Sequence, residues 1–168
     1  MQNHPLPWIT VTLFALVMSG GCSTDDSEHM EVHGYRSKEK VIEQTKRVSS
    51  ELLDATGIKG TTTKAGPGET TCGDQDDAFQ VQHSWSIYDV PLDTLKKGFY
   101  RLREKLPESG WKVTHRGRES SQARDRYVVY EHDKHKYGVR VVLFDDIGEQ
   151  SDPPGLVFEV ASACYSSE

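Results

Sequence analysis

The chain has 168 residues, enough for one domain and few for two. Charged residues make up 27% of it and apolar residues 35%, proportions that exclude both a wholly disordered chain and an integral membrane protein. The formal net charge is −6 at pH 7, and lysines and arginines form no cluster along the sequence. An acidic chain without a basic patch is repelled by nucleic acid and by anionic lipid headgroups, so we expect no nucleic-acid partner.

The first element is a short apolar run, Ile9 to Met18, followed by small residues and a cysteine. It falls well short of the ~20 residues that cross a bilayer as a helix. A run of this length is typical of the apolar part of a signal peptide, although no lysine or arginine precedes it here. We expect residues 1–21 to be a leader that is removed from the mature protein.

The end of this run resembles the lipobox of bacterial lipoproteins. Gly20 and Gly21 match the two small residues before the modified cysteine, and Ser19 stands where an aliphatic residue is usual. The resemblance implies cleavage before Cys22, lipid attached to Cys22, and localisation at the outer face of the cytoplasmic membrane. The alternative is a plain secretory leader, in which case Cys22 is an incidental thiol and the protein is secreted.

The residues after Cys22 are polar and poor in apolar side chains, a composition typical of a flexible linker. We therefore divide the chain into a leader at 1–21, a tether at 22–36 and a single domain at 37–168. A tether is expected if Cys22 carries lipid, because it separates the anchor from the folded domain.

Two amphipathic helices are predicted in the domain. The first spans residues 37–56, where apolar residues recur at helical spacing between Ser37 as N-cap and Gly57 beyond the last turn. The second spans 91–106 and carries a continuous stripe of leucine and phenylalanine. Residues 58–75, between the first helix and the first predicted strand, are rich in threonine and glycine without periodicity, and we predict a loop there.

Alternation of apolar and polar residues predicts the strands, which lie at 80–88, 111–115, 126–132, 137–144 and 156–163. The two central ones, 126–132 and 137–144, form a hairpin. These elements predict an α+β fold, a largely antiparallel sheet of about five strands with two helices packed on one face.

The chain has three cysteines, Cys22, Cys72 and Cys164, and an odd number in an exported protein needs an explanation. Lipid on Cys22, as the resemblance implies, leaves Cys72 and Cys164 to form a disulfide in an oxidising compartment. Closing a loop of roughly 90 residues stabilises the fold by about 4–5 kcal/mol in the chain-entropy model. The alternative is two free, buried thiols.

The order of parts is also similar to that of the LppA-like lipoproteins of high-GC Gram-positive bacteria. The shared features are the lipobox, an amphipathic helix, a cysteine before the strand at 83–87, the Gly110-Trp111 pair and a last strand that ends in Cys164. Such proteins are mostly without assigned activity. The resemblance therefore implies a compartment and a fold, and it adds no chemistry.

Histidines provide two candidate chemical sites. His132 and His135 flank Asp133 at the predicted hairpin tip, where they could hold a divalent cation, although an exposed turn is the default interpretation. His83 lies on the apolar face of its strand beside Trp85. A hydrogen-bonded structural histidine is the default there, and a catalytic base is the alternative.

Three aspartates, Asp74, Asp76 and Asp77, are spaced like the start of a calcium loop, but the required glycine and glutamate are missing. We predict a solvated acidic loop. The sequence contains no phosphate-binding loop and no nucleophile or zinc-protease motif, so we expect neither a cofactor nor a metal.

These observations predict a monomeric, membrane-anchored, non-enzymatic binding or accessory domain for a protein, a cell-wall component or a small ligand. Two alternatives come from other classes. One is a cell-envelope hydrolase or metal-dependent enzyme that uses His83 or the turn of His132 and His135. The other is an inhibitory or structural partner of a secreted enzyme. A pocket near His83 would favour a ligand or an enzyme.

Overall fold

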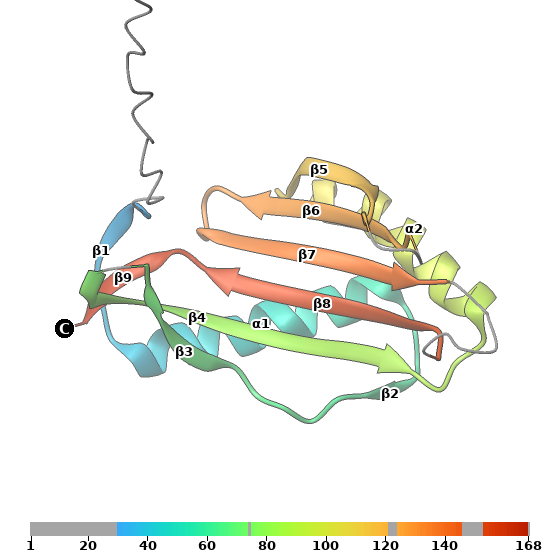
Figure 1. Cartoon of the computed structure of the whole chain (residues 1–168), viewed down its shortest axis with the longest axis horizontal. Coiled ribbons are helices and arrows are strands. Elements are labelled where there is room, and N and C mark those ends of the chain that lie inside the picture. The colour runs from blue at the N-terminus through green and yellow to red at the C-terminus, as the bar shows by residue number, and fades with distance from the viewer. Residues whose placement is uncertain (1–29, 74, 121–123, 146–152, 168) are drawn as a thin grey trace, which may run out of the picture.

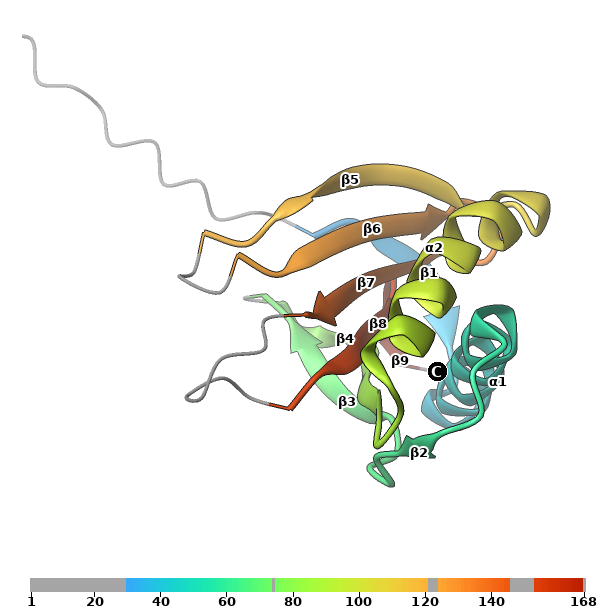
Figure 2. The same ribbon diagram turned by 90° about the vertical axis from the view of Figure 1, so that its right-hand side faces the viewer.

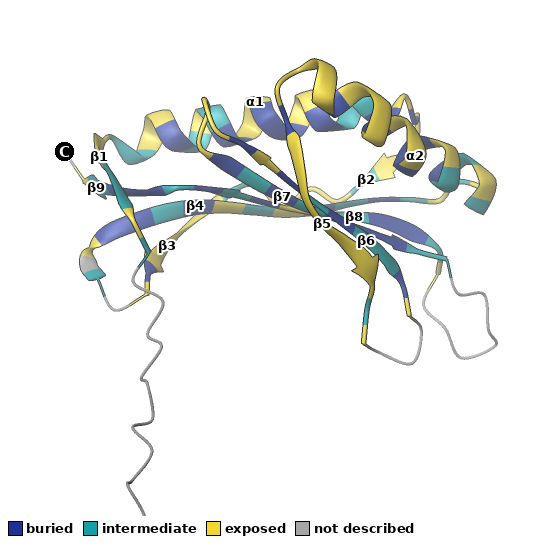
Figure 3. Cartoon of the chain, turned by 90° about the horizontal axis from the view of Figure 1, so that it is seen from above, coloured by how far each residue is buried: buried dark blue, intermediate teal, exposed yellow. Residues whose placement is uncertain are grey.

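A computed structural model describes residues 30–73, 75–120, 124–145 and 153–167, with the backbone alone at residue 76. The predicted leader, Cys22 and Asp74 lie outside these residues. The described chain forms one mixed sheet of nine strands with two helices over one of its faces (Figures 1 and 3). The elements, in chain order, are β1 (Val32–Arg36), α1 (Lys38–Thr56), β2 (Thr61–Thr62), β3 (Gly68–Cys72), β4 (Gln75–Tyr88), α2 (Leu92–Glu108), β5 (Lys112–Arg118), β6 (Arg126–His132), β7 (Tyr137–Phe144), β8 (Gly155–Ser162) and β9 (Cys164–Ser167).

Both predicted helices are confirmed. Ser37 is the N-cap of α1, and its Oγ accepts a hydrogen bond from the Lys40 N–H at 3.4 Å. Gly57 ends the helix with a φ of 66°, in the left-handed region that glycine adopts without steric cost. The two helices lie side by side on the same face of the sheet, as Figure 2 shows. Within the described residues, neither helix is long and apolar enough to cross a membrane.

The sheet is organised around β4, its longest strand. Gln82 of β4 pairs with Ala161 of β8 and with Gly68 of β3, so β8 and β3 lie on opposite edges of β4. On the β8 edge, β9 continues along the other end of β4, where Phe79 pairs with Tyr165. The strands β5, β6, β7 and β8 form an antiparallel meander, which continues the sheet outward from the β8 edge of β4 (Figure 1). Only β1, paired with β9, is parallel to its described neighbour.

The prediction of about five strands is therefore wrong in number. The five predicted segments correspond to β4, β5, β6, β7 and β8, whereas β1, β2, β3 and β9 have five residues or fewer. β2 and β3 lie in the predicted loop at 58–75, and β1 lies at the end of the predicted tether at 22–36. Except for Cys72, every residue of β3 is exposed, so no alternation marks it.

Apolar side chains from both helices and the meander form the main cluster. It contains the helix-facing residues of β4 and β8, including Trp85 and Phe158, whose rings stack at 4.0 Å between centroids. A separate small cluster at the other end of β4 joins Val41, Phe79 and Tyr165, with Val81. The predicted alternation of β4 is thus confirmed, because its apolar side chains face the helices.

Candidate functional site

The hairpin histidines do not form an exposed site. His132 is 7% exposed and lies in β6, and its ring packs edge-on against Trp111. Its Nδ1 accepts a hydrogen bond from the His135 N–H at 3.3 Å, so Nε2 carries the proton and donates to the Ser109 carbonyl at 3.1 Å. Both nitrogens are therefore used within the fold, and the prediction of a solvated turn is wrong for His132.

Asp133, beside these histidines, pairs instead with Lys112 of β5. The ammonium lowers the pKa of the Asp133 carboxyl, and the carboxylate raises the pKa of Lys112. No group of three or more His, Cys, Asp or Glu side chains in the described residues could hold a metal ion.

His83 links three parts of the fold. Its Nδ1 lies 2.8 Å from Ser49 Oγ of α1, and its Nε2 lies 2.8 Å from the Ala65 carbonyl. A carbonyl only accepts, so in the neutral ring Nε2 carries the proton and Nδ1 accepts from the Ser49 hydroxyl. The default interpretation of a hydrogen-bonded histidine is confirmed.

A pocket of about 290 Å³ surrounds this pair, and we call it the His83 pocket. One wall is a face of α1 on which Lys46, Ser49 and Leu53 lie about one helical turn apart. His83 and Trp85, neighbours on one face of β4, form the floor. The pocket lies at the small end of the range for ligand sites, and both of its histidine nitrogens already have partners.

Trp85 is 6% exposed, and its indole Nε1 has no hydrogen-bond partner among the described residues. A buried donor without a partner costs about 1–3 kcal/mol. The nitrogen itself is covered, with an accessible area below 1 Å², so it presents no donor to the pocket. Trp85 contributes an apolar wall.

The two remaining cysteines meet at the opposite end of β4. The structure brings Cys72 and Cys164 to disulfide distance, with the sulfur atoms 2.16 Å and the Cα atoms 6.1 Å apart. This geometry is consistent with the predicted pairing. Ala78 of β4 forms a small buried cluster with them, and Met30 and Val32 pack against this cluster. The disulfide therefore connects β3 to β9 across β4, where the N-terminal segment enters the domain.

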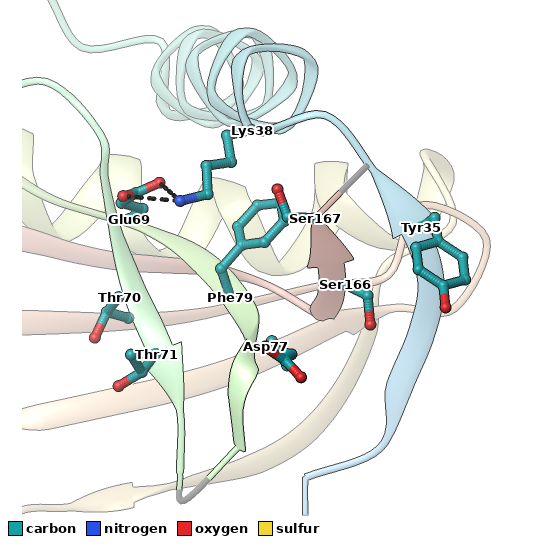
Figure 4. A pocket seen from close by; sticks show the side chains of 10 residues that line it. Tyr35, Lys38, Glu69, Thr70, Thr71, Asp77, Phe79, Ser166 and Ser167 are labelled. Carbon is teal, nitrogen blue, oxygen red and sulfur yellow. Dashed lines mark hydrogen bonds and ion pairs between the residues drawn. The ribbon is translucent and has the colours of Figure 1, made fainter.

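A pocket with a volume of about 580 Å³ lies at this same end (Figure 4). We call it the Tyr35 pocket. Its walls come from β1, β3, β4, β9 and the first turn of α1. Phe79 of β4 stands at its centre in Figure 4, below Lys38, whose ammonium lies 5.7 Å from the ring centroid. Lys38 also pairs with Glu69 at 3.0 Å, so these two charges neutralise each other.

Tyr35 is the most exposed large apolar side chain in the described residues, with 74% of its surface accessible. A bulge in β1 sets its position: Val32 pairs with Cys164 and Tyr35 with Ser166, so β1 advances three residues where β9 advances two. Gly34 lies in this bulge with a φ of 87°, in the left-handed region. Bulges of this kind change the direction of a side chain and are frequent beside binding sites.

Polar groups of this pocket remain available for a ligand. Among the described residues, no side-chain hydrogen bond or ion pair involves Asp77 or Ser166. In Figure 4 the oxygen atoms of Tyr35, Ser166 and Asp77 lie along one side of the pocket, whereas Thr70 and Thr71 point away from them. The arrangement can offer an aromatic face, a hydroxyl and a carboxylate to one ligand. Asp77 thus lies at a pocket wall, and the predicted acidic loop is in part strand, because β4 begins at Gln75.

Sequence reasoning identified His83 and the cysteine pair, and it missed Ser49 and Tyr35. Ser49 lies in the middle of a helix, where nothing in the local pattern distinguishes it from a surface serine. Tyr35 falls within the predicted tether at 22–36. The only local signal is the segment 32–35, which has a valine at its start, a glycine inside it and a tyrosine at its end. It is too short to predict a strand.

No protein-family model matches the chain, and neither a curated protein nor a solved structure matches it. The class that the structure itself defines is an α+β domain with a curled sheet covered on one face by two helices.

Proposed function

We propose that the protein is a lipid-anchored, extracytoplasmic binding domain whose ligand site is the Tyr35 pocket. The apolar run before Cys22, the polar residues after it and the cysteine pair at disulfide distance support an exported, anchored chain. The binding role rests on one observation. An exposed aromatic ring is held by a strand bulge at the wall of a pocket in which the side chains of Asp77 and Ser166 have no hydrogen-bond or ion-pair partner among the described residues.

The size of the pocket supports a small ligand or one segment of a larger one. Its volume of about 580 Å³ lies within the usual range of ligand sites, whereas the His83 pocket is half as large. The two pockets also differ in their polar groups. Those of the His83 pocket are occupied by the contacts of His83 with Ser49 and Ala65, whereas in the Tyr35 pocket the side chains of Asp77 and Ser166 make no hydrogen bond or ion pair among the described residues.

The position of the Tyr35 pocket fits an anchored protein. Val32, the first residue of β1, follows Cys22 by ten residues. A fully extended segment of ten residues spans at most ~36 Å. Lipid on Cys22 would therefore keep the pocket close to the membrane surface, where a ligand in the adjoining layer of the envelope can reach it.

The anchor is tested by the distribution of the protein between membrane and medium. In a bacterium that modifies lipoproteins, the chain should remain in the membrane fraction, and its intact mass should show a diacylglyceryl group on Cys22 as the new N-terminus. Cys22→Ala should move the protein out of the membrane. The matched variant Cys72→Ala should stay in the membrane. An unmodified chain that begins at another residue would contradict the proposal.

A second candidate function is an envelope hydrolase, because the Ser49 hydroxyl lies 2.8 Å from His83 Nδ1 and the Ala65 carbonyl orients the ring. Ser49 lies within α1, where the surrounding backbone N–H groups are used by the helix and cannot stabilise an oxyanion. A fluorophosphonate probe decides between the two functions. Labelling that disappears in Ser49→Ala and His83→Gln would support the hydrolase. The binding domain predicts no labelling at Ser49.

A further inference from the structure

The Tyr35 pocket combines three kinds of group whose chemistry selects a ligand. The first is an aromatic ring with an open face, because 74% of Tyr35 is accessible. The second is a hydroxyl, that of Ser166, and the third is the Asp77 carboxylate. All three lie along the side of the pocket formed by β1, β9 and β4 (Figure 4).

We propose that the ligand of the Tyr35 pocket is an uncharged saccharide chain, an inference that rests on the binding role proposed above. A pyranose ring has an apolar face of C–H groups and a rim of hydroxyls. The face packs against an aromatic ring. Neighbouring hydroxyls of the rim donate to a carboxylate, which accepts several charge-assisted hydrogen bonds, and exchange hydrogen bonds with a serine.

The charges of the pocket favour a neutral ligand over a charged one. Lys38 and Glu69 form an ion pair at 3.0 Å, which leaves Asp77 as the one described carboxylate of the pocket without a charged partner. Among the described lining residues, a polycationic peptide would find one unpaired carboxylate, and an anionic ligand would meet Asp77 with no free cation. A saccharide uses Asp77 as a hydrogen-bond acceptor and needs no opposite charge.

The size of the pocket favours a chain over a single sugar. Its walls come from five elements that surround the central ring of Phe79 (Figure 4), and its volume of about 580 Å³ exceeds that of one sugar ring. Tyr35 stands at one side and the ion pair of Lys38 and Glu69 at another, so that a second ring can pack beside the first. We therefore choose an oligosaccharide as the probe.

The experiment is isothermal titration of the purified chain with chitohexaose, a neutral hexasaccharide. We expect binding that changes less than twofold between low and high salt. Tyr35→Ala should weaken it at least tenfold, and Tyr35→Phe should retain it within about twofold because the ring face remains. Asp77→Asn should weaken it several-fold. Tyr100→Ala, at a second exposed tyrosine on α2 outside the pocket, is the matched control and should bind like the wild type.

Hexalysine is titrated in parallel as the cationic alternative. Binding of hexalysine that disappears at high salt and in Asp77→Asn, with no binding of chitohexaose, would overturn the saccharide ligand and leave the binding role of the pocket intact. Equal binding by Tyr35→Ala and the wild type would overturn both the ligand and the proposed site. Circular dichroism of each variant confirms that it is folded, so that a loss of binding can be assigned to the pocket.

Discussion

The two ends of β4 are stabilised by different means. The end that carries Trp85 and Ile87 lies in the main apolar cluster beneath both helices, where Phe158 stacks on Trp85. At the other end, β4 lies between the short strands β3 and β9, with β1 beyond β9, and the apolar cluster there has four buried members among the described residues. There, the cysteine pair joins the strands on either side of β4. Where an apolar cluster is too small to stabilise several short strands by burial alone, a disulfide can supply part of the missing stability.

The largest expected effect separates the two clusters. Phe158 is fully buried, so Phe158→Ala should lower the free energy of unfolding by about 3–5 kcal/mol through lost burial and a cavity. Phe79→Ala, the matched change at the other end, should cost less, because Phe79 borders the Tyr35 pocket and water can fill the space. Urea denaturation measures both. An equal or larger loss for Phe79→Ala would contradict the difference between the two ends.

The second prediction concerns the link itself. Cys72 and Cys164 are separated by 92 residues, and replacing both by serine should lower the free energy of unfolding by ~2–5 kcal/mol. The wild type treated with a reductant should show the same loss. Hydrogen exchange should show that amides of β1 and β3 lose protection, whereas those of β6 and β7 keep it. Uniform loss of protection across the sheet would mean that the two ends unfold together.

The third and smallest effect appears only at high pH. Burial raises the pKa of Tyr130 in the main cluster to about 12, and burial also raises the pKa of Tyr165 at the other end. The unfolded chain then loses these protons at lower pH than the folded chain, so stability should fall as pH rises between about 10 and 12. Tyr130→Phe should reduce this fall.

Urea midpoints measured across that pH range test the prediction, and the same variants at pH 7 reveal any loss caused by the missing hydroxyl alone. Tyr165→Phe should reduce the fall less than Tyr130→Phe, because burial raises the pKa of Tyr165 less strongly than that of Tyr130. A pH slope that neither variant changes would show that other groups control unfolding in alkali.

The difference between the two ends of β4 also explains how much of the fold the sequence predicts. The helices and the strands of the meander are long enough for their periodicity to be visible, and β6 and β7 have the bounds predicted for the hairpin. β1 and β9 are short, and their pairing joins residues more than 130 positions apart, such as Val32 and Cys164. No local pattern encodes such a pairing. The cysteine count is the one sequence feature that predicts a contact between distant segments at this end of the sheet.

The candidate site shows the same limit. His83 could be placed on the helix-facing side of its strand from alternation alone, but its partner Ser49 depends on how α1 is set against the sheet. Tyr35 falls within the predicted tether at 22–36, a prediction that rests on the polar residues after Cys22 and not on any signal at Tyr35 itself. The pocket that it borders requires five elements to meet, which is a property of the tertiary structure.

The packing of Met30 and Val32 against the cysteine pair has a mechanical consequence. A pull on the N-terminal segment reaches first the pairing of Val32 with Cys164, beside the covalent link. The link passes that load from β9 to β3, on the far side of β4, so three strands share it. If the chain is anchored through Cys22, as proposed above, the load would enter the domain at the corner that carries the covalent link.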